Sequence, residues 1–272
     1  MKFFFSIAAI VFYMLLINPV ERFSKSKMTA ERLSAMPDVQ VVELFSLEFK
    51  NLVSDLILFD AITFVGGSKT SLTTQQGEWL YSMLNTSSFL NPYNRDPYYF
   101  GQSFLTWEAK MYDAANILLE RGMQYRDKEW PFPFFIAYNY FYFLNDPMRG
   151  AEYMKVAIDR PGSSKVILTA LAAQLYYRSG RTEVGLLLLK DAVVHETNER
   201  VKKIYKKRIK AMEGVLTIEK AVEKYKKRYS KNPAGIDALI GSGFLKSQPR
   251  DPYGGQYYID KDGNVKSTSD FK

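Results

Sequence analysis

Side chains that catalyse reactions or hold metal ions are scarce in this chain. The 272 residues include one histidine, His195, and no cysteine. Such a chain cannot build disulfides, Cys-ligated zinc sites, iron–sulfur clusters or a histidine relay. A lone histidine near the end of a helix-forming stretch is expected to cap or pack rather than to catalyse. We therefore assign no catalytic, cofactor-binding or metal-binding residue and predict that the protein is not an enzyme.

Two short patterns resemble ligand-binding motifs but lack their context. Gly241 and Gly243 have the spacing of a phosphate-binding loop, but no strand pattern precedes them. Asp260, Asp262 and Asn264 supply alternating oxygens like the start of a calcium loop, but the downstream bidentate glutamate is absent. Turn chemistry explains these oxygens without a metal, and calcium binding stays open. The 29 acidic residues include no pair that stands out for catalysis.

The positive charge is concentrated in one part of the chain. The net charge is +8, and the whole surplus lies between Glu196 and Lys231, because basic and acidic residues cancel in the rest of the chain. The candidate basic patch consists of Lys202, Lys203, Lys206, Lys207, Arg208 and Lys210. Such a patch suits anionic lipid, an acidic protein face or nucleic acid, although only Tyr205 interleaves with it for base stacking, so nucleic acid is disfavoured. The alternative is that the lysines form the solvated face of helices that cap a helical array.

The N-terminus carries an apolar run. Residues 3–20 contain no charge and are at the lower end of the length that crosses a hydrocarbon core of about 30 Å. We predict a transmembrane anchor within residues 1–22; a cleaved signal segment is the alternative, although no small-x-small cleavage pattern follows. Basic residues after the run favour a cytoplasmic body. The short basic start is typical of an export signal, so we expect a single pass in a bacterial inner membrane with a periplasmic body.

The rest of the chain shows mostly helical spacing. Residues 38–95 are expected to form an N-terminal helical pair, in which one long amphipathic helix ends at Gly66 and Gly67 and a second follows from about Thr74. Residues 198–245 are expected to form basic capping helices. Residues 246–272 depart from the helical pattern, and Tyr257, Ile259 and Val265 flank an Asp-Gly turn. This tail is therefore predicted to be extended with a β-hairpin.

A pattern of small, large and small residues recurs with an offset of 35. The three copies are Ala115, Leu119 and Gly122, then Gly150, Met154 and Ala157, then Gly185, Leu189 and Ala192. Small residues seven apart lie on one helix face and let a neighbouring helix approach, while the large residue fills the space between them. Each copy follows another apolar helix and a short turn. Residues 96–197 therefore predict three helical hairpins.

These hairpins resemble the tetratricopeptide repeat (TPR) family. Phe141 and Tyr176 match the aromatic near the end of the family's first helix, Ala173 matches its small residue, and Tyr138 does not. Pro131 and Pro161 stand near the borders between repeats. The resemblance implies an all-α, TPR-like helical-hairpin solenoid of a membrane-anchored bacterial type. Together with the other segments, we expect this solenoid to carry an N-terminal transmembrane helix and a short C-terminal β-hairpin tail.

The resemblance also implies a groove lined by the first helix of each repeat. Carried over residue by residue, the partner-binding side chains are Phe100, Phe104, Trp107, Phe135, Asn139, Tyr142, Gln174, Tyr177 and Arg178. Asn139 and Gln174 would hold a peptide backbone and the aromatics would anchor it; alternatively, the aromatics are packed inside the superhelix. We predict a scaffold or assembly factor for a protein partner, without a cofactor. Binding of lipid or nucleic acid through the basic patch is the alternative.

The tail bears a second, shorter resemblance. Asp251, Pro252 and Tyr253 begin it as the C-terminal segment of major pseudopilins of type II secretion begins. The resemblance spans under 20 residues. Together with the anchor, it suggests an envelope, secretion or pilus machine as the place where the scaffold acts.

Overall fold

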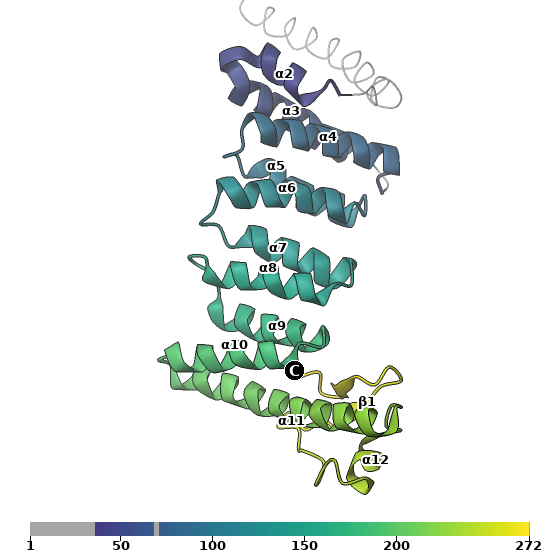
Figure 1. Ribbon diagram of the computed structural model, residues 1–272. Coiled ribbons are helices and arrows are strands. Elements are labelled where there is room, and N and C mark those ends of the chain that lie inside the picture. Colours follow the sequence, from purple (N-terminus) through teal and green to yellow (C-terminus); the bar gives the residue numbers. More distant parts are fainter. Residues whose placement is uncertain (1–35, 68–70, 272) are drawn as a thin grey trace, which may run out of the picture. The chain divides into compact units, whose positions relative to one another are not determined.

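The fold is almost entirely helical, which confirms the all-α prediction. The computed structural model describes residues 36–67 and 71–271 (Figure 1). The predicted anchor or signal segment at residues 1–22 lies outside this part. Within the described part, no helix has both the length and the hydropathy of a membrane span. The chain divides into two compact units, residues 1–122 and 123–272, and each is considered by itself.

The first unit contains helical pairs. Its elements are α2 (Val39–Ser46), the 3-10 turn η1 (Leu47–Phe49), α3 (Lys50–Gly67), α4 (Thr74–Leu90), α5 (Asp96–Trp107) and α6 (Tyr112–Tyr125), the last of which extends past residue 122. The single long helix expected from residue 38 is wrong, because Leu47 takes a φ of 46° and interrupts it. Thr73 caps α4 in a capping box with Gln76, which is why the helix begins there.

Helices α3 and α4 pack through small residues. Ser54 Oγ donates to the Ser87 carbonyl at 2.9 Å, and Ser87 Oγ donates to the Ser54 carbonyl at 3.0 Å. Both serines are fully buried. At another level of the same helix pair, the Phe64 and Trp79 ring centroids lie 4.5 Å apart. The reciprocal hydrogen bonds satisfy the hydroxyl groups, so the helices approach closely without orphaned polar atoms. One face of α3 therefore packs against α4.

The other face of α3, together with α2, leaves large apolar side chains exposed. We call this set the α2–α3 apolar face. Its members are Val41, Leu44, Phe45, Leu47, Phe49, Leu52, Leu56, Phe59 and Ile62. Phe45 is 79% exposed and Phe59 66%. So many exposed large apolar side chains on neighbouring elements are typical of a contact with lipid or with another protein.

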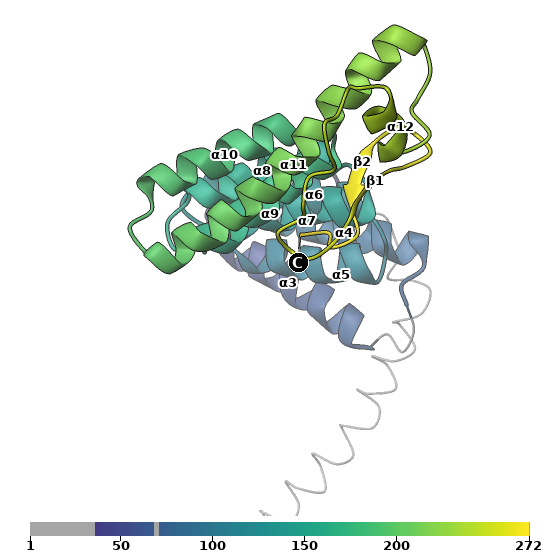
Figure 2. The same cartoon turned by 90° about the horizontal axis from the view of Figure 1, so that it is seen from below.

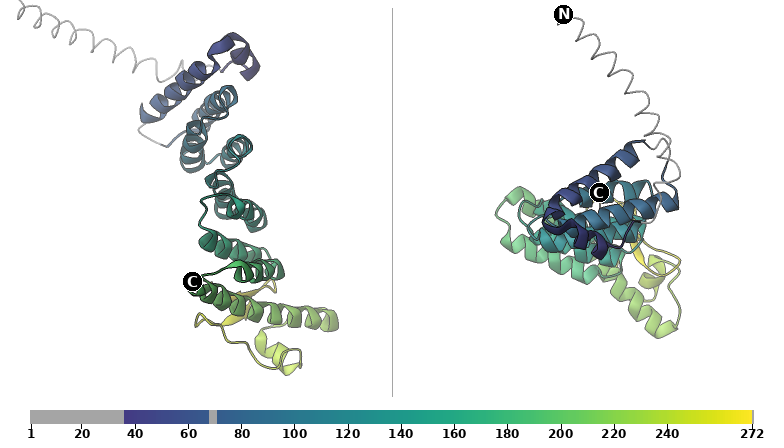
Figure 3. Two further views of the ribbon diagram at one scale, coloured as in Figure 1. Left: turned by 90° about the vertical axis from the view of Figure 1, so that its left-hand side faces the viewer. Right: turned by 90° about the horizontal axis from the view of Figure 1, so that it is seen from above.

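The second unit stacks helical hairpins against a long helix and a small sheet. Its elements are α7 (Pro131–Tyr138) with the π-helical turn η2 (Asn139–Phe143), α8 (Pro147–Asp159), α9 (Lys165–Arg178), α10 (Thr182–His195), α11 (Glu199–Tyr229), α12 (Ile236–Gly241), β1 (Tyr257–Ile259) and β2 (Val265–Ser267). The strands pair antiparallel, with Ile259 opposite Val265, which confirms the predicted hairpin. Figures 2 and 3 show this hairpin lying along α11.

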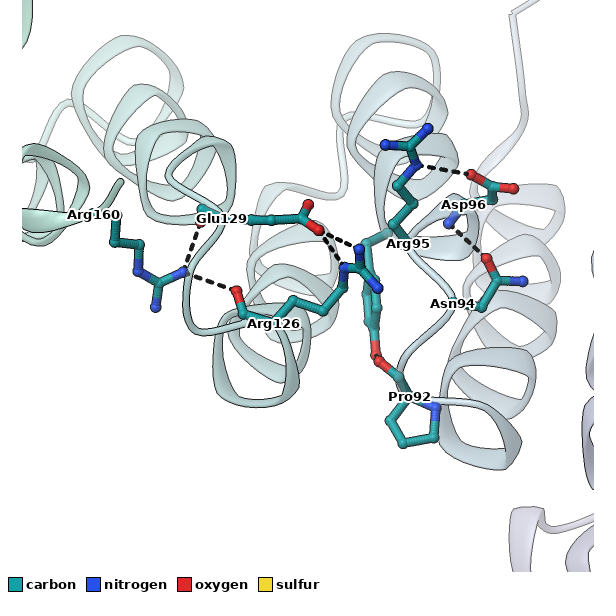
Figure 4. A network of polar contacts seen from close by, with 8 residues as sticks. Pro92, Asn94, Arg95, Asp96, Arg126, Glu129 and Arg160 are labelled. Atoms are coloured by element: carbon teal, nitrogen blue, oxygen red, sulfur yellow. Dashed lines mark hydrogen bonds and ion pairs between the residues drawn. The ribbon is translucent and has the colours of Figure 1, made fainter. Parts of the chain in front are cut away.

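Arg160 holds the segment before α7 in place. Its guanidinium donates to the Glu129 carbonyl at 2.7 Å and to the Met123 carbonyl at 3.1 Å. Arg126 forms an ion pair with Glu129, so the segment is fixed by two arginines (Figure 4). Figure 4 also shows a comparable local turn in the first unit, where Asn94 Oδ1 accepts from the Asp96 N–H at 3.1 Å.

The 35-residue pattern coincides with the closest helix contacts of the second unit. A Cβ added at Gly150 would lie 3.1 Å from the Ala137 carbonyl oxygen, and one at Gly185 would lie 2.7 Å from that of Ala173. The same added atoms would lie 3.1 Å from Phe141 Cβ and 3.2 Å from Tyr176 Cβ. The glycines therefore let α8 approach α7 and α10 approach α9.

A π-helical turn explains why Tyr138 does not fit the repeat. Ala137 takes the place opposite Gly150 that Ala173 takes opposite Gly185, so the hairpin of Gly150 has one extra residue between this alanine and its aromatic. The turn η2 accommodates this residue, since the Leu144 N–H donates to the Asn139 carbonyl five residues earlier. Phe141, which lies within this turn, therefore faces Gly150 as Tyr176 faces Gly185.

Substitution of Ala157 tests the packing of the second hairpin. Ala157 is fully buried, so Ala157→Leu is expected to lower the free energy of unfolding by about 1–3 kcal/mol through overpacking. Lys155→Leu on the exposed side of α8 is the control and is expected to change the stability little. Urea denaturation followed by circular dichroism measures both. Equal stabilities would contradict the assigned helix face.

Candidate partner-binding site

The predicted groove residues of α5 lie at or near the surface of the first unit. Phe100 and Phe104 are half-buried, and their ring centroids are 4.4 Å apart. Trp107 at the end of the helix is 53% exposed. Of the three, Trp107 offers the largest accessible aromatic surface.

The residues of α7 and η2 differ sharply in exposure. Tyr142 is 59% exposed and stacks on Tyr138 at 5.2 Å, and Phe135 is half-buried. Asn139 is fully buried, which corrects the expectation that its amide faces a groove. Asn139 begins the π-helical turn, whose extra residue shifts the helix faces relative to the expected repeat. The sequence register alone could not reveal this shift.

The three predicted residues of α9 all contact the C-terminal segment of the same chain. Gln174 Nε2 donates to the Asp270 carbonyl at 3.0 Å, and Arg178 Nη2 pairs with the Asp270 carboxylate at 2.5 Å. The Ser267 N–H donates to the Tyr177 hydroxyl at 3.1 Å. Burial raises the pKa of Tyr177, so its phenol stays protonated at neutral pH. These side chains therefore hold an extended segment, as the groove hypothesis requires, but the segment is intramolecular.

An aromatic residue and an arginine complete this contact. Phe271 is 1% exposed, and its ring centroid lies 4.9 Å from that of Tyr177. Arg208 of α11 donates to the Phe271 carbonyl at 2.9 Å and to the Ala170 carbonyl at 2.9 Å. Arg208 is thus part of this contact and not of a solvent-facing basic patch, which corrects its assignment. We call Gln174, Tyr177, Arg178 and Arg208 the α9–α11 clamp.

A serine and aspartate cluster fixes the base of the segment held by the clamp. The Asp251 carboxylate accepts from Ser267 Oγ at 2.5 Å and Ser269 Oγ at 2.6 Å. It also accepts from the Tyr253 N–H at 2.8 Å. Burial raises the pKa of Asp251, but these hydrogen bonds and nearby Lys207 outweigh it, so the pKa lies below its ordinary value. The carboxylate is therefore ionised and keeps accepting at neutral pH.

A cleft of about 610 Å³ opens beside the clamp in the second unit. The turns after η2 and α9, helix α11 and strand β2 border it. Its charged lining side chains are Arg178, Glu219, Lys266 and Asp270. Burial raises the pKa of Glu219, while a hydrogen bond from Thr182 opposes the change. The cleft combines both charge signs with aromatic walls, which suits a peptide rather than an apolar ligand.

The remaining members of the basic patch line one face of α11. Lys203, Lys206, Lys207 and Lys210 are exposed. Lys202 pairs with Glu199 at 2.8 Å. Lys207 also lies 4.2 Å from the Tyr253 ring centroid, in cation–π geometry. The face is suited to anionic surfaces, although part of it is tied to the tail.

The other chemical candidates have local structural partners. His195 is exposed, and its Nδ1 lies 3.0 Å from the Asp191 carbonyl. Asp260 accepts from the Asn264 N–H at 2.8 Å and pairs with Lys266 at 2.9 Å, which lowers its pKa to about 2. Turn chemistry accounts for these contacts. Across residues 36–67 and 71–271, no cluster of His, Asp or Glu side chains is arranged to hold a metal ion.

Sequence reasoning missed the occupancy of the α9 surface. The contact joins Gln174 to Asp270 and Arg208 to Phe271, pairs that lie far apart in the chain. The only signal was the presence of serine, acidic and aromatic side chains in the tail. Comparisons with family models, with curated proteins and with solved structures find no match for this chain.

Proposed function

We propose that the protein is a membrane-anchored scaffold that binds a protein partner through a TPR-like helical surface. The observation that carries the proposal is the α9–α11 clamp. Gln174 and Arg208 bind backbone carbonyls and Arg178 binds a carboxylate. Recognition of backbone groups by side chains, beside a buried aromatic anchor, is how peptide-binding surfaces combine affinity with selectivity. The function needs no cofactor.

The N-terminal sequence supports the membrane part of the proposal. Residues 3–20 form an uncharged apolar run. The first described helix begins at Val39, so few residues separate it from the run and it can lie near the membrane that the run would enter. The α2–α3 apolar face lies in this proximal part of the chain. We place the scaffold in a bacterial inner membrane with a periplasmic body, in an envelope, secretion or pilus machine.

Partner capture from detergent-solubilised membranes tests the proposal. Trp107→Ala combined with Tyr142→Ala removes the two most exposed predicted anchors and is expected to reduce capture at least tenfold, since two such anchors contribute roughly 2–4 kcal/mol. Tyr93→Ala is the control, because Tyr93 is 65% exposed and lies outside the predicted set. Capture that survives the double substitution would contradict groove recognition.

The exposed lysines of α11 support a second candidate function, which is binding to anionic lipid or, less favoured, nucleic acid. The triple substitution Lys203→Glu, Lys206→Glu and Lys210→Glu reverses the charge of this face and leaves the four residues of the clamp unchanged. If this variant loses its partner at physiological salt while the Trp107 and Tyr142 variant keeps it, the basic face is the recognition surface. Steep weakening with added salt would accompany that result.

A further inference from the structure

We infer that residues 267–271 are an intramolecular ligand of the α9–α11 clamp. The partner presents a segment in which an acidic residue precedes an aromatic one, and this segment displaces residues 267–271 from the clamp. The inference rests on the proposed function and names the chemistry that its binding surface selects. In the protein without a partner, residues 267–271 therefore cover the clamp. Binding of the partner then requires exchange of one segment for another.

The contacts of the clamp are those of peptide recognition. Two of its hydrogen bonds go to the carbonyls of Asp270 and Phe271, and backbone carbonyls occur in any peptide. Selectivity comes from Arg178, which pairs with the Asp270 carboxylate, and from Tyr177, whose ring packs against Phe271. A segment of another protein with an acidic residue before an aromatic one can satisfy all four groups.

The backbone of the bound segment is strained at the place where it is held. Asp270 has a φ of 46° and Phe271 a φ of 58°. Non-glycine residues adopt this left-handed region rarely and at a free-energy cost, least for Asp and more for a bulky side chain. A partner segment that binds in an extended conformation would avoid this cost. A partner segment without this cost can therefore bind the clamp more tightly than residues 267–271 do.

The ion pair at the centre of the clamp is accessible to a competitor. The Arg178 and Asp270 side chains are 36% and 33% exposed, and both line the open cleft. An incoming carboxylate can therefore approach Arg178 before the Asp270 carboxylate has left. Removal of the deeply buried Phe271 follows as a second step.

A peptide-binding experiment with the full chain in detergent tests the inference. The probe is a fluorescein-labelled peptide with the sequence of residues 264–272, followed by anisotropy. The unchanged chain should bind it weakly, because the tethered copy has an effective concentration of about millimolar. Asp270→Lys places a lysine beside Arg178, and the repulsion between the two cations should release the tail from the clamp. The affinity for the labelled peptide should then rise at least about tenfold. Asp262→Lys makes the same charge change at an exposed position in the hairpin turn and should leave the affinity unchanged.

A charge exchange checks that the ion pair controls the occlusion. Adding Arg178→Glu to Asp270→Lys restores opposite charges, so the tail should close again and hydrogen exchange of residues 267–271 should return to that of the unchanged chain. The peptide should also bind weakly, because the tail occupies the clamp and because Glu at 178 repels the acidic residue of the peptide. Hydrogen exchange of residues 267–271 is therefore the measurement that reports opening and closing in both variants. If exchange rises in Asp270→Lys but the peptide still binds weakly, the clamp is not a peptide site and the inference is overturned. An equal gain in affinity for Asp262→Lys would overturn it as well.

These outcomes are distinct from failure of the proposed function. Partner capture by the Trp107 and Tyr142 variant depends on aromatic anchors outside the clamp. Loss of capture in that variant, together with failure of the peptide experiment, refutes the inference and leaves the scaffold function standing. Undiminished capture in that variant, together with tenfold tighter peptide binding to Asp270→Lys, refutes the predicted anchors and leaves the clamp as the binding site.

Discussion

Phe271→Ala is expected to detach the tail from α9 and α11 at a cost of about 3–5 kcal/mol, the range for truncation of a fully buried phenylalanine. Phe271 is 1% exposed and packs against Tyr177 and Tyr253, so its removal leaves a cavity between helices and tail. Hairpins α7–α8 and α9–α10 do not depend on the tail for their mutual packing. The loss should therefore appear as local opening, with the helical content largely kept.

Hydrogen exchange resolved by segment measures this effect. Protection of β1, β2 and the amides of residues 267–271 should fall, while protection of α8 should stay unchanged. Tyr258→Ala is the matched control, because Tyr258 lies in the same hairpin but is 43% exposed. Cooperative loss of protection in all helices of the second unit would show that the tail is an integral part of its core instead of a separable ligand.

The repeat architecture of the second unit could be predicted because it rests on local chemistry. Gly150 and Gly185 mark positions where no side chain fits against the facing helix, and such positions recur in the sequence at a constant offset. The hairpin tail was predictable for the same reason, since Asp260 and Gly263 satisfy the turn with their own neighbours. Local rules of helix spacing and turn formation are sufficient for these elements.

The site was only partly predictable, because it depends on events that the pattern does not encode. The extra residue in η2 buries Asn139, and no sequence signal separates a π-helical turn from an ordinary helix end. Arg208 is one of several basic residues in a row, and only tertiary structure turns it toward Ala170 and Phe271. The resemblance to the TPR family predicts the groove residues of α9, and the structure shows that they bind the tail of the same chain.

Occlusion of the clamp by the tail has a consequence for the proposed scaffold function. If a partner must displace residues 267–271, the measured affinity is the intrinsic affinity reduced by the fraction of open clamps. The full chain should therefore bind more weakly than its contacts suggest. Partners that present an acidic and an aromatic side chain together would be favoured over partners that present either one alone, because each replaces a contact that the tail already makes.

If residues 3–20 anchor the protein in a membrane as proposed, removal of residues 1–20 is expected to leave only reversible membrane binding. The apolar run supplies about 0.8 kcal/mol for each buried methylene group, so its loss should abolish permanent anchoring. The shortened chain should still associate with neutral phosphatidylcholine vesicles through the α2–α3 apolar face. Asp55 and Asp60 lie on the same helix, so this association should not depend on anionic lipid and should be insensitive to salt.

Vesicle sedimentation of the shortened chain measures this residual association. Phe45→Glu with Phe59→Glu should reduce it at least a hundredfold, because each inserted phenylalanine contributes about 1.5–3 kcal/mol. The control is Leu187→Glu with Val194→Glu on α10, where the side chains are 62% and 76% exposed in the second unit. Equal losses in the two variants would assign the association to general surface hydrophobicity. Strong binding only to anionic vesicles, lost at high salt, would assign it instead to Lys203, Lys206 and Lys210 of α11.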